Sequence, residues 1–183
     1  FLLKCVSGIL SQLGTLVPQM NHLPIAANSS QHMGEIMNFI GTGKKLDNID
    51  LPKIGRLIRV GEDEIHAIID VESKGTGWDS ENRPIILFEP HIFYKQLAAN
   101  KPASLQTAVS QGLAYQKWGT KPYPRDSYPV LEKAILIDQE LALRSASWGL
   151  GQIMGFNFSM VGYKSAQEMV EHFKLDEENH LVA

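Results

Sequence analysis

Cysteine is almost absent from this chain, since Cys5 is the only one among 183 residues. A single cysteine excludes an intramolecular disulfide, and a zinc site built on several cysteines has no ligands. The chain can therefore fold in a reducing compartment. Long hydrophobic runs are absent too, because no stretch approaches the roughly 18 uninterrupted apolar residues of a transmembrane helix. We accordingly expect no membrane span.

An excess of positive charge is also missing. The formal net charge is -3, and no cluster of lysine and arginine offsets it. Nucleic-acid binding relies on a basic surface that displaces counterions, so we expect no nucleic-acid partner. With 44% hydrophobic and 20% charged residues, the composition is that of an ordinary globular protein, and the length fits one domain with a short appendage.

The first 45 residues differ in pattern from the rest. Apolar residues at positions 2, 6, 9, 13, 16 and 17 share one helical face, which predicts an amphipathic helix ending at Pro18. The polar, irregular segment up to Gly34 is typical of a linker. We therefore expect residues 1–45 to form an N-terminal helix and linker of unassigned role, and residues 46–183 to form the main domain.

Helical periodicity dominates the main domain. It predicts a mostly α fold with at most a small β element near residues 84–89, where an apolar run indicates a strand. Residues 100–127 are rich in Pro, Gly, Ser and aromatic side chains and are interpreted as a loop. Ser165 followed by Glu168 predicts a capping box. Helices are expected over residues 35–40, 53–60, 62–73, 91–99, 129–146 and 165–173.

One carboxylate falls on the apolar face of the helix expected over residues 62–73. Glu72 follows Ile65, Ile68 and Ile69 at the spacing i, i+3, i+4, i+7. A carboxyl group on the core side of a helix is desolvated, which raises its pKa and lets it stay protonated as a general acid. The alternative is a half-exposed glutamate in the last turn that makes a structural hydrogen bond.

Three segments of the chain together carry a resemblance that none carries alone. They are Val71-Glu72-Ser73-x-Gly-x-Gly, Ile86-Leu87-Phe88-Glu89-x-His91-x-Phe93-Tyr94 and Ser145-Ala146-Ser147-Trp148-Gly149-Leu150-x-Gln152-Ile153-Met154-Gly155. In their order and separation these segments resemble the N-acetylmuramidase family of phage and prophage endolysins, and more distantly goose-type lysozymes and soluble lytic transglycosylases. The resemblance covers about Asp50 to Ala183.

The resemblance implies a lysozyme-like, two-lobed fold with a glycan-binding groove. It implies cleavage of the β-1,4 bond between N-acetylmuramic acid and N-acetylglucosamine, with Glu72 as the general acid and Glu89 as the second functional carboxylate. No metal and no organic cofactor are expected, and His91 lacks the acidic or histidine partner at i+4 that a metal site would need. The substrate-binding residues implied by position are Ser73, Tyr94, Ser147, Trp148, Gln152 and Met154.

The expected partner is the glycan strand of peptidoglycan, and the protein is expected to act as a monomer. The opening residues lack a clear small-residue cleavage site, so they are not interpreted as a signal peptide. An endolysin made in the bacterial host cytoplasm would then reach the cell wall through a holin lesion.

The role of the second carboxylate has alternatives. Glu89 can stand across a groove from Glu72 or can fix a loop by hydrogen bonds to backbone amides, and Asp79 and Glu81 are alternative bases. A separation of about 6.5–9.5 Å between the two carboxylates favours inversion, and about 5–5.5 Å favours a covalent intermediate. Without a second carboxylate, a lytic transglycosylase that forms anhydro ends is the alternative enzyme. A non-catalytic lysozyme-like module that binds glycan or protein is the alternative from another class.

Three features depart from the family pattern. Pro90 follows Glu89 where the family commonly has Arg, and Gly151 stands where an aromatic residue is common. The family also continues beyond the position of Ala183 with a helical segment that carries Tyr-Asn-Gly. A truncated chain explains this ending, and a shortened, inactive remnant explains it as well.

Overall fold

The computed structural model describes residues 37–47, 50–61, 63–67 and 76–183. The chain divides into two units, and the second, Gly34–Ala183, contains all of these residues. The N-terminal helix and linker expected before residue 37 lie outside the described residues. So do Glu72, Ser73 and the second half of the helix expected over residues 62–73.

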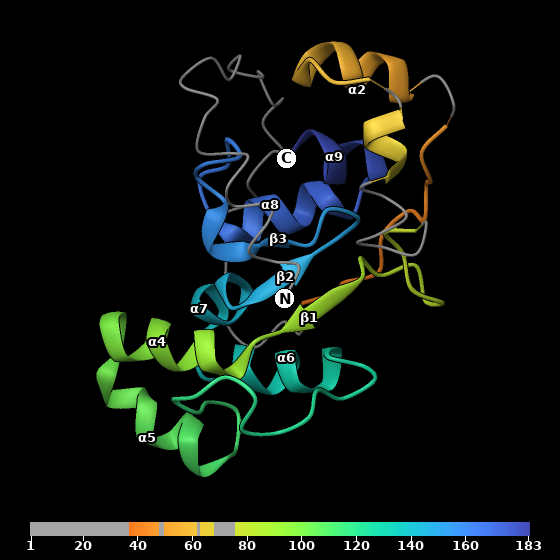
Figure 1. Ribbon diagram of the computed structural model, residues 1–183. Helices are drawn as coiled ribbons and strands as arrows, with labels where there is room; N and C mark the ends of the chain where they lie inside the picture. The colour runs from red at the N-terminus through yellow and green to blue at the C-terminus, as the bar shows by residue number, and fades with distance from the viewer. Residues whose placement is uncertain (1–36, 48–49, 62, 68–75) are drawn as a thin grey trace, which may run out of the picture. The chain divides into compact units, whose positions relative to one another are not determined.

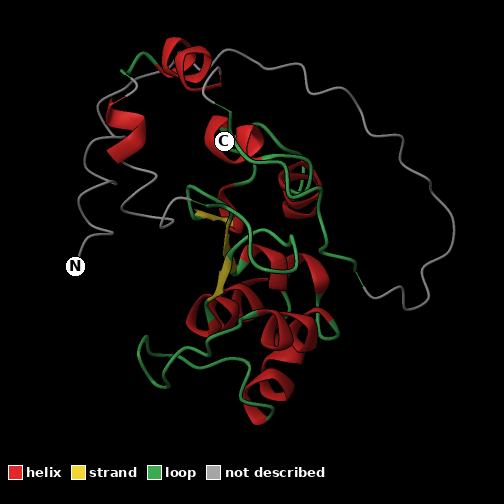
Figure 2. Cartoon of the chain, turned by 90° about the vertical axis from the view of Figure 1, so that its right-hand side faces the viewer, coloured by secondary structure: helices red, strands yellow, loops and turns green. Residues whose placement is uncertain are grey.

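The described part of the chain is mostly helical, with one small antiparallel sheet (Figures 1 and 2), as the periodicity predicts. Residues 63–67 are helical as well. None of the helices in these ranges is long and apolar enough to cross a membrane. The elements are α2 (Asp50–Ile58), β1 (Ile86–Phe88), α4 (Pro90–Asn100), α5 (Pro102–Ser110), α6 (Tyr128–Ile135), α7 (Gln139–Arg144), β2 (Ala146–Trp148), β3 (Ile153–Met154), the 3-10 helix η1 (Gly155–Asn157), α8 (Ala166–Phe173) and α9 (Glu177–Val182).

The sheet has the strand order β1-β2-β3, with both pairs antiparallel. Ser147 on β2 pairs with Leu87 on β1 and with Met154 on β3. The strand predicted near residues 84–89 is confirmed by β1, and the two other strands come from the Ser145–Gly155 segment. Strands this short carry too little alternation to be recognised in the sequence. Helices α4 to α6 lie on one side of the sheet, and α8 and α9 lie on the other (Figure 1).

Two predicted elements in the middle of the chain are wrong. The helix expected over residues 129–146 is two helices, α6 and α7, because Asp138 adopts an extended backbone and caps α7 by accepting a hydrogen bond from the Leu141 N–H at 2.9 Å. The loop expected over residues 100–127 contains α5, which Pro102 starts from the first helical position. Residues 37–40, expected to be helical, have no regular secondary structure.

The capping box predicted at α8 is half confirmed. The Ser165 hydroxyl accepts a hydrogen bond from the Glu168 N–H at 3.0 Å, as a helix N-cap does. The Glu168 carboxylate, however, accepts from the N–H of Lys164 at 2.6 Å, one residue before the cap. The helix start is therefore fixed by both side chains, although the second hydrogen bond is shifted by one residue.

Two hydrophobic clusters form the core. The larger one joins α4 to α8 and includes the fully buried Phe93, Leu143, Trp148 and Phe173. A smaller cluster consists of Leu51, Ile54, Ile65 and Leu150. It links α2 and residues 63–67 to the hairpin between β2 and β3, and Leu181 and Val182 of α9 pack against it.

Helix α9 joins these parts through two buried polar side chains. Glu177 accepts hydrogen bonds from the N–H groups of Leu46 at 2.9 Å and Gly77 at 2.7 Å, and from the Thr76 hydroxyl at 3.2 Å. His180 Nε2 donates to the Phe173 carbonyl at 2.6 Å, and its Nδ1 accepts from the Leu150 N–H at 3.2 Å. A carbonyl can only accept, so the ring is the neutral Nε2–H tautomer. We call Glu177 and His180 the α9 clamp.

We expect Gly155→Ala to be strongly destabilising. A methyl group at this position would overlap the backbone carbonyl of Leu143, and backbone cannot move aside as a flexible side chain can. The expected loss is about 1–3 kcal/mol of unfolding free energy, measured by denaturant titration. Gly151→Ala is the control, because its methyl group would be 3.5 Å from the nearest atom, the His180 carbonyl oxygen, at ordinary contact distance. Equal stability of the two variants would contradict this packing.

The His180 ring makes stability depend on pH. Burial lowers the pKa of His180 below its ordinary 6.5, so the folded protein keeps the ring neutral while the unfolded chain takes up a proton. The contribution of this ring to the free energy of unfolding is therefore fully present above pH 6.5. It decreases as the pH falls below 6.5, by at most about 1.4 kcal/mol per pH unit. Unfolding titrations of the wild type and His180→Gln between pH 5 and 8 measure this slope. The slope is expected to shrink in the variant, and an unchanged slope would refute the assignment.

Candidate active site

Glu89 is held by regular secondary structure on both sides. Its N–H donates to the Ser145 carbonyl at 2.8 Å, which continues the hydrogen bonding of β1 with β2. Its own carbonyl accepts from Ile92 and Phe93 as the N-cap of α4. Pro90, the departure from the family pattern, occupies the first helical position, where a missing N–H costs nothing. The backbone of Glu89 is therefore fixed independently of its side chain.

The Glu89 carboxylate is only 15% exposed and lies among aromatic and imidazole groups. The Tyr123 hydroxyl donates a hydrogen bond to Oε2. His91 Nδ1 lies 3.1 Å from the same oxygen, although the two atoms lack hydrogen-bonding geometry, and Nδ1 has no hydrogen-bond partner in the described part of the chain. The protein thus presents one fixed carboxylate with a defined donor and a nearby imidazole.

The neighbours of Glu89 are neutral at physiological pH. Burial and the Glu89 charge raise the pKa of Tyr123 far above its usual value and raise the pKa of Tyr115 as well. Burial lowers the pKa of His91, and this outweighs the opposite effect of the Glu89 charge. Both tyrosines therefore keep their hydroxyl protons, and the His91 ring is uncharged. None of these three side chains places a positive charge beside the Glu89 carboxylate.

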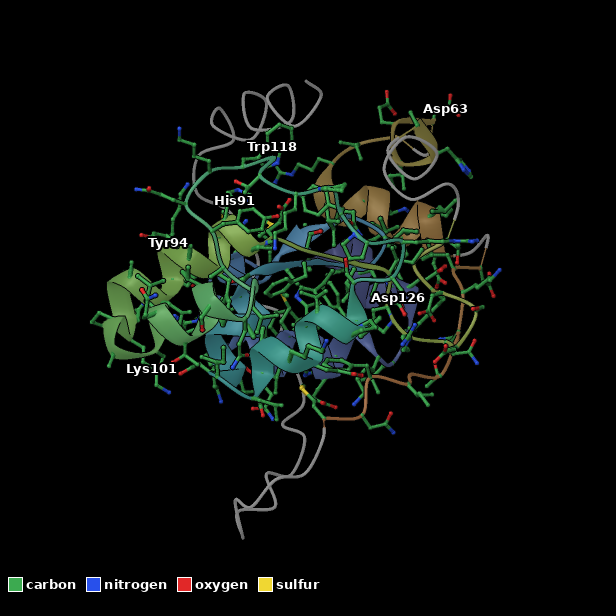
Figure 3. The ribbon with its side chains drawn as sticks, turned by 90° about the horizontal axis from the view of Figure 1, so that it is seen from below. Asp63, His91, Tyr94, Lys101, Trp118 and Asp126 are labelled. Atoms are coloured by element: carbon green, nitrogen blue, oxygen red, sulfur yellow. The ribbon has the colours of Figure 1, made fainter. Side chains whose placement is uncertain are left out.

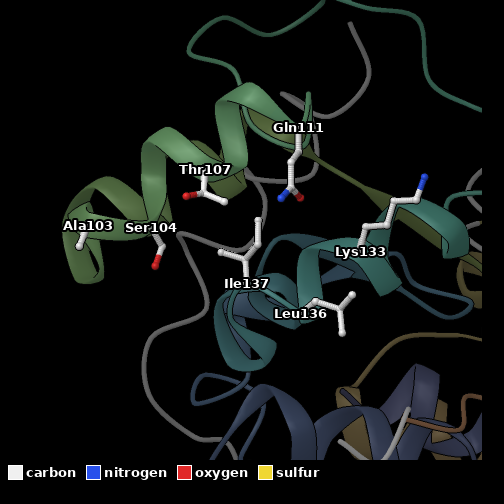
Figure 4. Close-up of a pocket in the computed structure, with 7 residues that line it drawn as sticks. All are labelled: Ala103, Ser104, Thr107, Gln111, Lys133, Leu136 and Ile137. Atoms are coloured by element: carbon white, nitrogen blue, oxygen red, sulfur yellow. The ribbon is translucent and has the colours of Figure 1, made fainter.

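A pocket of about 310 Å³ lies beside Glu89. Its walls come from the start of α4 and from the loop between α5 and α6, and they are mainly apolar. A larger pocket of about 380 Å³ lies between α5 and the end of α6 (Figure 4). No acidic residue lines either pocket, but only the smaller one is lined by the chain neighbours of Glu89, Phe88 and Pro90, and by its hydrogen-bond donor Tyr123. The smaller pocket is lined by Phe88, Pro90, Gly112, Tyr115, Lys121, Pro122, Tyr123, Pro124, Ser127 and Val130.

The hairpin between β2 and β3 brings Ser147 and Gln152 together. The Ser147 hydroxyl donates to Gln152 Oε1 at 2.8 Å, and Gln152 Nε2 donates to the carbonyls of Gly149 at 2.8 Å and Ile85 at 3.3 Å. Gln152 has a φ of 48°, a left-handed conformation that is uncommon outside glycine. Both amide donors are thus engaged within the protein, so Gln152 shapes the turn. One lone pair on its oxygen remains for a ligand.

Of the remaining expected substrate contacts, Trp148 is not at the surface. It has no exposed area, and its indole N–H donates to the Leu143 carbonyl at 3.0 Å. We therefore do not include it in the proposed site, since a ring without exposed surface cannot stack on a sugar. Tyr94 on α4 and Met154 on β3 are both half-buried. Figure 3 shows Tyr94 and His91 on α4.

The alternative bases have other partners. Asp79 accepts hydrogen bonds from the N–H groups of Glu81 and Arg83, and from the Arg83 Nε at 2.7 Å. Arg83 is also paired with Glu81 and Asp126, and its guanidinium stacks on Tyr128. Asp79 therefore stabilises a turn, and Glu81 is exposed. Among the described residues, no group of three or more His, Cys, Asp or Glu side chains is arranged to hold a metal ion.

The sequence reasoning missed Glu177 and His180, and it did not place Tyr123 beside Glu89. Thr76 and Gly77, which follow directly on the segment that contains Glu72 and Ser73, are bound to the Glu177 carboxylate. Gly77 and Gly149 have no room for a side chain because the His180 ring occupies the space. The glycines of the two motifs could have indicated this contact, because a glycine often stands where another group lies close to the backbone.

Comparison with known proteins gives one family. The family model described as Muramidase, N-acetylmuramidase, matches residues 62–183, which is more than half of the chain. A search of curated proteins finds no match.

One similar solved structure is the crystal structure of the Burkholderia AP3 phage endolysin, with a TM-score of 0.67 and 34% sequence identity. The match covers 76% of this chain and 53% of that chain, so this chain spans about half the length of the endolysin. This structural similarity confirms the predicted lysozyme-like fold class. The mostly helical architecture with one small sheet agrees with it.

We expect Gln152→Glu to destabilise the hairpin. The new carboxylate still accepts from Ser147, but it removes both donors and brings an oxygen towards the carbonyls of Gly149 and Ile85. A loss of about 1–3 kcal/mol of unfolding free energy is expected in denaturant titrations. Gln139→Glu is the control, because the Gln139 side chain makes only an exposed hydrogen bond, to Gln167. If Gln152→Glu unfolds like the wild type, the amide does not fix the turn.

Proposed function

Because this chain belongs to the N-acetylmuramidase family, we propose that it is an endolysin-type peptidoglycan hydrolase. We propose that it cleaves the β-1,4 bond between N-acetylmuramic acid and N-acetylglucosamine. The observation that carries the proposal is the Glu89 carboxylate, which is largely buried beside a pocket and held by the Tyr123 hydroxyl. It sits within the residues that the family model matches.

Cleavage of a glycosidic bond requires two functional groups with different roles. Glycoside hydrolysis needs a protonated carboxylic acid at the leaving oxygen and usually a carboxylate on the other side of the bond. We assign the first task to Glu72, whose position in the sequence motif matches the family acid. Thr76 and Gly77, the last two residues of this motif in the sequence, are hydrogen-bonded to the Glu177 carboxylate.

We assign the second task to Glu89. Its fixed backbone and the hydrogen bond from Tyr123 leave Oε1 as the oxygen without a partner among the described residues, so this atom can orient water or stabilise positive charge on the sugar. The neutral His91 ring beside it adds no competing positive charge. Ser147 and Gln152 support this arrangement from the neighbouring strand by fixing the hairpin.

The proposed substrate is the glycan strand of the bacterial cell wall. We propose that the protein reaches this substrate from the host cytoplasm after a holin opens the inner membrane. Substrate contacts are proposed for Ser73, Tyr94, Ser147, Met154 and the remaining lone pair of Gln152.

Glu72→Gln is expected to lower the clearing rate of chloroform-permeabilised Gram-negative cells at least 100-fold, because an amide cannot donate the proton that the leaving oxygen needs. Glu89→Gln is expected to lower the rate at least 10-fold, since the amide keeps the size of the side chain but lacks its charge. Turbidity loss of the cell suspension measures both rates. Glu81→Gln is the matched control, because Glu81 is an exposed carboxylate.

Mass analysis of the products identifies the reaction. Reducing ends with added water support hydrolysis, and anhydro ends would replace it with the lytic transglycosylase reaction. Clearing by Glu72→Gln at the wild-type rate would overturn the assignment of the acid. No clearing by the wild-type protein would leave a binding module as the function of this chain.

A further inference from the structure

The loop between α5 and α6 carries the most exposed large aromatic side chain among the described residues. Trp118 is 70% exposed, while Trp78 is 5% exposed and Trp148 is fully buried. Single exposed apolar residues are common and need no explanation by themselves. The position of Trp118 relative to Glu89 is what distinguishes it.

Trp118 shares its loop with the hydrogen-bond donor of Glu89. Tyr123 lies five residues further along the same loop, and its hydroxyl donates to Glu89 Oε2. Figure 3 labels Trp118 on this loop and His91 at the start of α4, and the Tyr115 N–H of the loop donates to the Pro90 carbonyl at 3.4 Å. The loop that carries the exposed indole is therefore bound both to the start of α4 and to the proposed active-site carboxylate.

The pocket beside Glu89 lies under the same loop. Tyr115, Lys121 and Tyr123 contribute walls from the loop, and Phe88 and Pro90 contribute walls from β1 and α4. Its volume of about 310 Å³ is at the lower end of the range for ligand pockets, so it fits one small unit or substituent. The apolar walls suit a methyl group, and the Lys121 ammonium suits a carbonyl oxygen.

We propose that this loop forms a subsite for one N-acetylated pyranose ring, with Trp118 as the stacking platform. The apolar C–H face of the ring would lie on the exposed indole, and the acetamido group would enter the pocket near Lys121. The proposal rests on the proposed glycan-cleaving function and names a part of the site that neither the motifs nor the comparisons assign. Trp118 acts here in binding and takes no part in proton transfer.

Tryptophan fluorescence tests the subsite without relying on activity. The chain has three tryptophans, and two of them are buried, so acrylamide quenching reports mainly on Trp118. In Glu72→Gln protein, which cannot cleave, soluble peptidoglycan glycan strands are expected to reduce the quenching slope at least two-fold. Glu72→Gln/Trp118→Phe protein supplies the control signal, which is expected to be weakly quenched with and without glycan.

Substitution then measures the contribution to binding. In the Glu72→Gln background, Trp118→Ala is expected to raise the Kd for glycan strands about 3- to 10-fold, and Trp118→Phe is expected to recover most of the affinity because it keeps an aromatic face. In active protein, Trp118→Ala is expected to raise KM several-fold and leave kcat within about two-fold. Leu136→Ala is the matched control, because Leu136 is 84% exposed and lines the other pocket, between α5 and α6.

The outcomes separate the two proposals. Glycan binding that leaves the quenching of Trp118 unchanged would overturn the subsite while the proposed function stands. Equal loss of affinity in Trp118→Ala and Trp118→Phe would also overturn it, because the stacking face would then be irrelevant. Absence of glycan binding together with absence of clearing would overturn both the subsite and the hydrolase.

Discussion

The hydrogen bonding of the Glu177 carboxylate is the interaction on which the geometry of this domain depends. A carboxylate removed from water costs several kcal/mol unless other donors replace the water. Glu177 has three such donors, and they come from Leu46, Thr76 and Gly77, about 100 to 130 residues earlier in the chain. One buried side chain at the start of α9 thereby fixes the approach to α2 and the end of the segment that carries Glu72.

His180 extends the same constraint to the sheet. Its ring contacts Trp78 and Phe173 and binds the Leu150 N–H of the β2–β3 turn. The space it occupies excludes side chains at Gly77 and Gly149, which belong to two different sequence motifs. The glycines of the two motifs thus have a packing reason, and the hairpin that holds Ser147 and Gln152 is positioned by a residue near the C-terminal end of the chain.

The candidate site combines this frame with the loop between α5 and α6. Glu89 and Ser147 are on regular elements, and the β1–β2 hydrogen bonds determine their separation. Tyr123 and Trp118 are on the loop between α5 and α6, and the Tyr123 hydroxyl donates to the carboxylate. Placing the proposed catalytic groups on rigid elements and the proposed binding group on a loop allows precise chemistry together with variable recognition.

The sequence by itself determined the helical class, β1, α4, the cap of α8 and the family, because periodicity, N-caps and ordered motifs are local properties. It also determined that Glu89 lies at the end of the apolar run that forms β1. Only the tertiary structure decided that Trp148 is core, that Gln152 fixes a turn, and that α6 and α7 are separate helices. It alone brought Tyr123 to Glu89 and Glu177 to Gly77. These contacts join residues 34 to 100 positions apart, and no local pattern encodes which distant partner satisfies a buried polar group.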